Sequence, residues 1–169
     1  MDEIIIEVVP VTWRKSLFKS EPWAMIITNE RLIFAKWTQE LFNKEAQKRK
    51  EQTKEEGEGK LKQFLSQLSA SFSYYDKYYQ MQPEEIGHEH PDNFSIYSKD
   101  VTDIRLRKGT VRGGKTSRIN VKINVGSNEV EDLETPHELT MTVNGQKIVF
   151  QFNKNFEEVK QALSGLFKF

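Results

Sequence analysis

The sequence predicts an α+β fold: a seven-stranded β sandwich or partly open barrel, followed by a C-terminal helix and interrupted by an inserted helical hairpin. Three observations lead to this prediction. Most of the chain alternates apolar and polar side chains with the period of two that half-buried strands show. The last fifteen residues place apolar side chains at helical spacing instead. A segment rich in charge and tyrosine, residues 38–92, separates two groups of strands. We expect one domain, residues 1–169, because a chain of this length forms roughly one domain.

The first three predicted strands lie close together near the N-terminus. Residues 4–9 alternate, with apolar side chains at every even position. The next two strands, residues 23–28 and 31–37, are apolar runs separated only by Asn29 and Glu30. A two-residue connection is typical of a β hairpin, and asparagine tolerates the left-handed backbone conformation that such turns use.

The other four predicted strands follow the inserted segment. Residues 101–108 and 119–125 alternate clearly, and the second of these runs shows the clearest alternation in the chain. Residues 139–143 and 148–152 flank Asn144-Gly145, the dipeptide that supplies the two positive φ angles of a type I′ turn. The sequence therefore predicts a second hairpin at the end of the sheet.

The chain ends in a predicted amphipathic helix. Asn155, with Glu158 three residues later, is a plausible capping box with Asn in place of the usual Ser or Thr. One apolar stripe follows: Phe156, Val159, Leu163 and Leu166. We expect this stripe to cover the open end or one face of the sandwich.

The inserted segment, residues 38–92, is predicted to lie between the third and fourth strands as a pair of helices. Residues 39–60 carry six basic and six acidic side chains, and Glu–Lys and Glu–Arg pairs four residues apart favour an exposed helix. A Gly-Glu-Gly sequence interrupts it. A second helix, ended by Pro83, is predicted from a heptad-like seam: Leu61, Leu65, Leu68, Phe72, Tyr75 and Tyr79.

Three stretches of the sequence resemble the pleckstrin-homology-like superfamily, in its bacterial and GRAM-like branch. Trp23–Phe34 is similar to the strand–turn–strand pattern of that branch, Asp100–Leu106 to its fourth strand, and Leu139–Leu166 to its final hairpin and helix. The resemblance covers residues 1–37 and 94–169, and the insertion departs from it. It implies a non-enzymatic binding module, often for phosphoinositides, membranes, peptides or other proteins; fold alone does not select among these.

The tyrosine-rich part of the insertion is the predicted interface. Four of the five tyrosines lie within residues 74–79. On a helix they form two adjacent apolar stripes, and one contact face cannot easily hide both, so one stripe faces a partner protein or a second copy, or else both are buried within the chain. We expect a protein partner, and an insertion that the β domain does not need for folding. The candidate interface residues are Phe72, Tyr74, Tyr75, Tyr78, Tyr79 and Met81.

A basic segment offers an alternative function. Residues 105–122 contain seven basic side chains and no acidic one. Such a segment can contact anionic lipid headgroups peripherally, or nucleic acid, with salt-sensitive affinity. Phosphoinositide sites of typical family members use the loop between strands one and two, which here holds only the basic residues Arg14, Lys15 and Lys19. The candidate anion-binding residues are Arg105, Arg107, Lys108, Arg112, Lys115, Arg118 and Lys122.

Two weaker motifs are interpreted as structural. Gly109–Thr116 matches the phosphate-binding P-loop pattern, but residues 117–125 alternate like a strand where a P-loop needs a helix. Nucleotide binding is therefore only a distant alternative to a glycine-rich connection. The segment 84–92 contains His88 and His90 among acidic residues, and is interpreted as an exposed loop rather than a metal site.

Composition limits the remaining classes of function. The chain has no cysteine, which excludes disulfides, thiol catalysis and thiolate zinc sites. Its 25 basic and 25 acidic residues give no net charge, so binding of nucleic acid is not expected. No apolar run approaches the length of a spanning helix. We expect no catalytic residue, metal or cofactor, and a cytoplasmic location that includes the membrane periphery.

Overall fold

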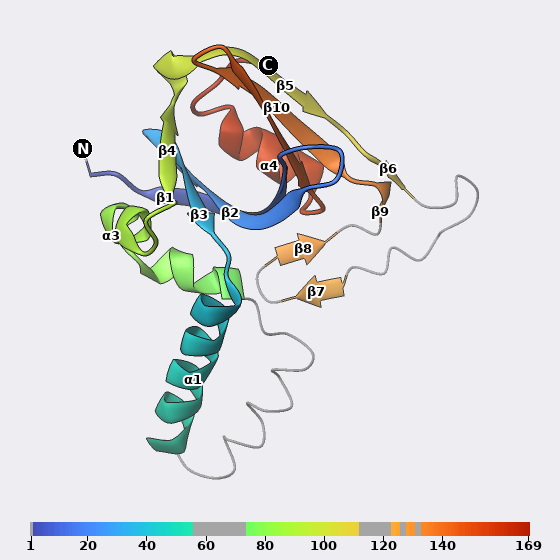
Figure 1. The fold of residues 1–169 in the computed structure, drawn as a ribbon. Helices are drawn as coiled ribbons and strands as arrows, with labels where there is room; N and C mark the ends of the chain where they lie inside the picture. The colour runs from blue at the N-terminus through green and yellow to red at the C-terminus, as the bar shows by residue number, and fades with distance from the viewer. Residues whose placement is uncertain (1, 56–73, 112–122, 126–127, 131–132) are drawn as a thin grey trace.

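The computed structural model describes residues 2–55, 74–111, 123–125, 128–130 and 133–169 (Figure 1). Its centre is a seven-stranded antiparallel sheet in the order β4-β3-β2-β1-β11-β10-β5. These strands are β1 (Ile5–Arg14), β2 (Ser20–Thr28), β3 (Arg31–Lys36), β4 (Phe94–Tyr97), β5 (Val101–Arg107), β10 (His137–Val143) and β11 (Gln146–Phe152). The predicted α+β class, with a seven-stranded sheet and a C-terminal helix, is confirmed.

Smaller elements complete the described part of the chain. Two short antiparallel pairs join β6 (Thr110–Val111) to β9 (Leu133–Thr135) and β7 (Ile123–Val125) to β8 (Asn128–Val130). The helices are α1 (Gln39–Glu55), the 3₁₀ helix η1 (Tyr74–Gln80), α3 (Pro83–His88), the 3₁₀ helix η2 (Ser98–Asp100) and α4 (Phe156–Leu163). Residues 61–73, which hold most of the predicted heptad-like seam, lie outside the described residues.

One predicted strand is replaced by another in the main sheet. Residues 119–122 lie outside the described part of the chain, and residues 123–125 pair, within that part, with β8 alone. The seventh strand of the sheet is instead β4, which pairs with β3. β4 is only four residues long, too short for its sequence to show an alternation that predicts a strand.

Both predicted hairpins form, but only one uses left-handed residues. Asn144 and Gly145 have φ angles of 50° and 78°, as the type I′ turn requires. No other residue of the described ranges except glycine has a positive φ, so the expectation for Asn29 is wrong. The Thr28 hydroxyl closes that turn instead: it accepts hydrogen bonds from the backbone N–H groups of Glu30 and Arg31 and donates one to the Arg31 carbonyl.

The C-terminal helix packs on the inner face of the sheet, as predicted. The Asn155 side chain accepts hydrogen bonds from the N–H groups of Glu157 and Glu158, which caps the first turn of α4. Figure 1 shows α4 enclosed by the curved sheet. The inner core joins α4 to all the long strands and includes Val9, Trp23, Met25, Phe34, Leu139, Phe150, Val159 and Leu163.

The inserted segment covers the outer face of the sheet. Five residues on that face of β1, β2 and β3 are fully buried: Val8, Ala24, Ile26, Ile33 and Ala35. Tyr74 and Tyr78 of η1 and Ile86 of α3 pack on them. Replacing the insertion by a linker would expose these five residues, which argues against the expectation that the β domain does not need the insertion for folding. Among the described helices of the insertion, only α1, beyond its first turn, points away from the sheet (Figure 1).

The interface prediction is wrong for its two central residues. Tyr74 and Tyr78 are 3% and 0% exposed, and they lie within the chain's own second core. Tyr75 and Met81 are partly buried against the same cluster, Tyr79 is exposed, and Phe72 lies outside the described residues. Their 3₁₀ geometry differs from the predicted α helix, and Pro83 begins α3 rather than only ending a helix. Burial inside one chain leaves Tyr74 and Tyr78 unavailable to a partner.

The buried tyrosines predict a specific response to alkali. Burial, with the nearby Glu89 carboxylate, raises the pKa of Tyr78, and burial raises the pKa of Tyr75 to about 12. A folded-state pKa above the unfolded value of about 10 gives stability that is complete below pH 10 and is lost as pH rises through the folded value. The free energy of unfolding measured in urea should therefore fall between about pH 10 and pH 12. Tyr78→Phe should show a smaller fall. An identical fall in this variant would contradict the attribution of the lost stability to ionisation of Tyr78.

Candidate functional site

The three predicted anion-binding residues that the structure describes each lie close to a carboxylate. Four of the seven lie outside the described residues: Arg112, Lys115, Arg118 and Lys122. The other three are exposed and lie within 4.0 Å of a carboxylate: Arg105 Nε at 3.2 Å from Asp103, Arg107 Nη2 at 3.2 Å from Glu138, and Lys108 Nζ at 4.0 Å from Glu157. Exposed pairs of this kind contribute little stability, but they partly neutralise the charge that an anion would meet.

The described start of the P-loop match has a structural explanation. A Cβ atom on Gly109 would lie 2.0 Å from the carbonyl oxygen of Thr135 and 2.7 Å from the backbone of Pro136. The Gly109 N–H also donates a 2.8 Å hydrogen bond to His137 Nδ1. Glycine is therefore required at position 109 for two chain segments to cross closely. Residues 112–116 of the match lie outside the described residues.

The histidine-containing segment 84–92 makes local contacts. His88 Nδ1 lies 2.7 Å from the Glu84 carbonyl oxygen, and His90 Nδ1 accepts a hydrogen bond from the Asp92 N–H. Across the residues that the structure describes, no three histidine, aspartate or glutamate side chains converge as a metal ion would need.

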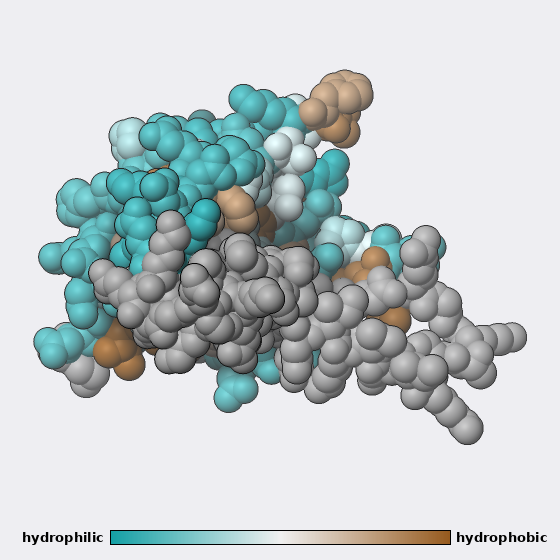
Figure 2. Space-filling model, turned by 90° about the horizontal axis from the view of Figure 1, so that it is seen from below, coloured by the Kyte–Doolittle hydropathy of each residue, from teal (hydrophilic) through white to brown (hydrophobic). Residues whose placement is uncertain are grey.

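The most unusual surface feature is the loop between β1 and β2. Leu17 and Phe18 are 83% and 98% exposed, the two most exposed large apolar side chains in the described ranges. Figure 2 shows a brown, apolar projection at the upper right that stands out beyond neighbouring teal side chains, on the side where this loop lies in Figure 1. Exposed apolar groups that stand out in this way mark contact sites more often than ordinary surface.

A tight turn holds the two apolar side chains at the tip of the loop. The Ser16 hydroxyl accepts hydrogen bonds from the N–H groups of Phe18 and Lys19, at 3.3 and 3.1 Å. The N–H groups of Lys15 and Ser16 both donate to the Lys19 carbonyl, at 2.9 and 3.1 Å. These bonds close residues 15–19 on themselves, so the chain cannot fold Leu17 or Phe18 back onto the sheet without breaking them.

Cations and aromatic rings surround the base of this loop. A cavity of about 490 Å³ lies there, lined by Trp13, Arg14, Lys15, Phe94, Gln146, Lys147 and Ile148. Lys15 Nζ stands 4.5 Å from the centre of the Trp13 ring, which itself packs against Trp23 and Phe94 at 5.4 Å each. Cation–π contact with a rigid aromatic wall fixes the direction of the Lys15 ammonium group.

Two carboxylates partly balance these cations. Glu21 accepts from Lys15 at 2.9 Å and lies 3.7 Å from Lys19, and Asp92 accepts from Lys36 at 2.7 Å. The Lys15 ammonium lowers the pKa of Glu21, and the Lys36 ammonium lowers the pKa of Asp92, so both carboxylates are ionised near neutral pH. The local cations outnumber them and are Arg14, Lys15, Lys19, Lys36 and Lys147. With five cations against two carboxylates, the base of the loop carries a net positive charge.

We call this set the β1–β2 surface: Leu17 and Phe18 at the tip, and Arg14, Lys15, Lys19, Lys36 and Lys147 around it. Three of its cations, Arg14, Lys15 and Lys19, are visible in the sequence as loop residues, whereas the apolar pair was not predicted as part of a site. The signal that could have found it is two large apolar residues inside Arg-Lys-Ser-Leu-Phe-Lys-Ser, between two predicted strands, where a loop needs no apolar side chain. Lys36 and Lys147 come from the ends of other strands and carry no local signal.

Comparison with known proteins does not assign a family. No family model matches the chain, and no curated protein matches it. Among solved structures, the chain is similar to the C-terminal domain of an unknown protein from Leishmania infantum, with 11% sequence identity and a TM-score of 0.41; the match covers 98% of this chain and 86% of the other. No helix in the described ranges is long and apolar enough to cross a membrane.

Proposed function

We propose that this protein is a non-enzymatic binding module that docks on anionic membrane surfaces through the β1–β2 surface. One observation carries the proposal: Phe18 and Leu17 are almost fully exposed at the tip of a hydrogen-bonded turn, and Lys15 and Lys19 belong to the same loop. The tip would enter the boundary between headgroups and acyl chains, while the cations contact lipid phosphates. Combined apolar insertion and basic charge is the pattern of reversible membrane binding.

The free energy of moving apolar side chains out of water favours insertion of Leu17 and Phe18 into a membrane. Moving a leucine or phenylalanine side chain fully out of water contributes about 1.5–3 kcal/mol. The same side chains, left exposed, give the folded chain no stability in return. Nearby cations add attraction that falls with salt, because the negative potential of an anionic leaflet extends over only about one Debye length.

The arrangement of the strands supports the same class of function. Four strands in meander order, three more strands, and a helix that closes the sheet are the succession expected from the pleckstrin-homology-like resemblance. We therefore keep a pleckstrin-homology-like module as part of the proposal. A protein partner held by the tyrosine-rich helix is not proposed, because Tyr74 and Tyr78 are buried in the chain. The basic segment 105–122 is not proposed as the lipid contact, because the β1–β2 loop combines its cations with Leu17 and Phe18, the two most exposed large apolar side chains of the described ranges.

Co-sedimentation with vesicles tests the proposal. The chain should bind vesicles of phosphatidylcholine and phosphatidylserine more tightly than pure phosphatidylcholine, and the affinity should fall as salt rises. Leu17→Ser with Phe18→Ser should weaken binding about tenfold or more, since 1.4 kcal/mol is tenfold in affinity. The matched control is Ile4→Ser with Val111→Ser, which removes two other exposed apolar side chains. Equal loss in both double variants, or no loss in the first, would contradict the proposal.

A further inference from the structure

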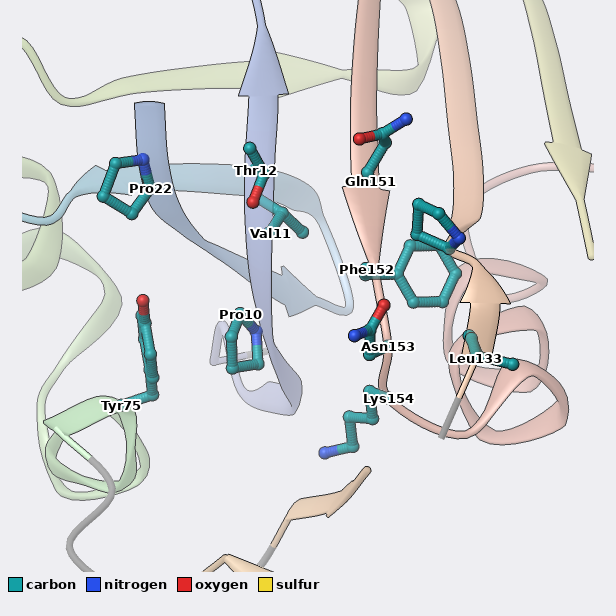
Figure 3. Close-up of a pocket in the computed structure, with 11 residues that line it drawn as sticks. Pro10, Val11, Thr12, Pro22, Tyr75, Leu133, Gln151, Phe152, Asn153 and Lys154 are labelled. Carbon is teal, nitrogen blue, oxygen red and sulfur yellow. The ribbon is translucent and has the colours of Figure 1, made fainter. Parts of the chain in front are cut away.

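The sheet is split where β1 meets β11. These neighbouring strands pair at only two positions, Thr12 with Gln151 and Trp13 with Phe150. Pro10 has no N–H with which to continue the ladder. The earlier half of β1 and the residues after β11 therefore part, and a cavity of about 460 Å³ lies between them (Figure 3). We call this the seam cavity.

Rigid apolar groups form most of the walls of the seam cavity. They are Pro10, Val11, Pro22, Leu133, Pro136 and Phe152. Figure 3 shows Tyr75 of η1 on one side of the opening and Phe152 and Leu133 on the other, with Pro10 between them. Prolines and packed side chains have little freedom to collapse inward, so the cavity is pre-formed.

Four polar side chains line the same cavity without using their hydrogen-bonding groups. They are Thr12, Tyr75, Gln151 and Asn153. Within the described part of the chain, no hydrogen bond engages the side chain of any of them, although each carboxamide offers two donors and an acceptor. Small-molecule sites typically combine apolar walls with a few such polar groups.

The charged group in the wall is already fully engaged. Lys154 is 3% exposed, and its ammonium lies 2.5 Å from Glu7 Oε1, 3.2 Å from the Val8 carbonyl oxygen and 3.5 Å from the Tyr79 hydroxyl. Three acceptors match the three donors of an ammonium group. An anion in the cavity would therefore find no unpaired cation among the described lining residues. A cation would find no carboxylate among them.

We propose that the seam cavity binds an uncharged small molecule with an apolar ring or chain and an amide-like group that both donates and accepts hydrogen bonds. The apolar part lies among Pro10, Leu133 and Phe152, and the polar group pairs with the carboxamides of Gln151 and Asn153. This site is separate from the β1–β2 surface and does not depend on membrane binding.

Three probes of similar size and different charge test this proposal: benzamide, benzoate and benzylammonium. In ¹H–¹⁵N correlation spectra of the full chain, benzamide should shift the side-chain amides of Gln151 and Asn153 saturably, with a dissociation constant of the order of 1 mM, as expected for a ligand of this size. Benzoate and benzylammonium should bind about tenfold more weakly, because burying an unpaired charge is costly.

Matched variants show whether benzamide binds in the seam cavity. Gln151→Leu and, separately, Asn153→Leu should each weaken benzamide binding about fivefold, and Gln80→Leu, an exposed carboxamide on η1, should not change it. The same spectra report whether each variant is folded, and the test needs only one of the two seam variants to be folded. Shifts that do not saturate, equal affinity for the three probes, or unchanged affinity in a folded seam variant would overturn the proposal.

Discussion

Replacing Tyr78 by alanine is expected to lower the free energy of unfolding by about 3–5 kcal/mol, the range for a buried aromatic truncated to alanine. Tyr78 is fully buried between η1 and the outer face of the sheet. Its hydroxyl donates a 2.9 Å hydrogen bond to Glu89 and lies 3.3 Å from the Tyr74 hydroxyl. The substitution therefore opens a cavity. It also removes a hydrogen-bond partner from the Glu89 carboxylate and from the Tyr74 hydroxyl. Equilibrium unfolding in urea measures the change.

Two controls separate packing from other effects. Tyr78→Phe keeps the ring and removes only the hydroxyl, so it should cost less, about 1–3 kcal/mol, as the partner Glu89 loses its donor. Tyr97→Ala removes the same side chain from a site that is 40% exposed and should cost less than either. If Tyr78→Ala instead left stability unchanged, the inserted segment would not be part of the folded core, and its second hydrophobic cluster would be incorrect.

Replacing Glu7 by alanine should destabilise the fold by about 3 kcal/mol, because it leaves the buried Lys154 ammonium without its carboxylate. Lys154 is almost fully buried, whereas the Glu7 side chain is 19% exposed. Glu7 also accepts hydrogen bonds from the Tyr79 hydroxyl and the Val8 N–H. The two partners of this pair are therefore not equivalent.

The reverse change is expected to cost less. Lys154→Met keeps most of the apolar stem of the side chain and removes the ammonium group, and Glu7 retains two donors and some contact with water. Urea unfolding of both variants should rank the loss as Glu7→Ala above Lys154→Met. The opposite ranking would show that Lys154 reaches water in solution and that the ion pair is not buried.

Most of the inner layer of the fold, the sheet with α4 packed on its inner face, follows from local sequence signals. The hairpins around residues 29–30 and 144–145, and the stripe of α4, depend on alternation, turn chemistry and capping, which are properties of short segments. The outer layer, in which η1 and α3 cover the other face of the sheet, depends on contacts between distant segments. Even so, one signal was available: residues 23–28 form an almost uninterrupted apolar run, and all six are buried. A strand without polar alternation is covered on both faces, which predicts a second layer.

The candidate site was harder to predict for a physical reason. Charge is visible in a sequence, and counting it favoured residues 105–122, whereas pairing with Asp103, Glu138 and Glu157 appears only in the folded chain. The exposure of Leu17 and Phe18 is likewise set by tertiary structure, since most such pairs in proteins are buried. The split between β1 and β11 depends on Pro10 and on where β11 ends, and the seam cavity had no signal in the sequence.

A fluorophore at the tip of the β1–β2 loop tests membrane docking most directly. The chain has no cysteine, so Leu17→Cys and, as a control, Glu84→Cys on the exposed start of α3 can each carry one environment-sensitive label. With vesicles that contain phosphatidylserine, the label at position 17 should shift to shorter wavelength and brighten, as its surroundings become apolar, while the label at position 84 stays unchanged. No shift at position 17, or the same shift at both positions, would contradict insertion of the loop into the membrane.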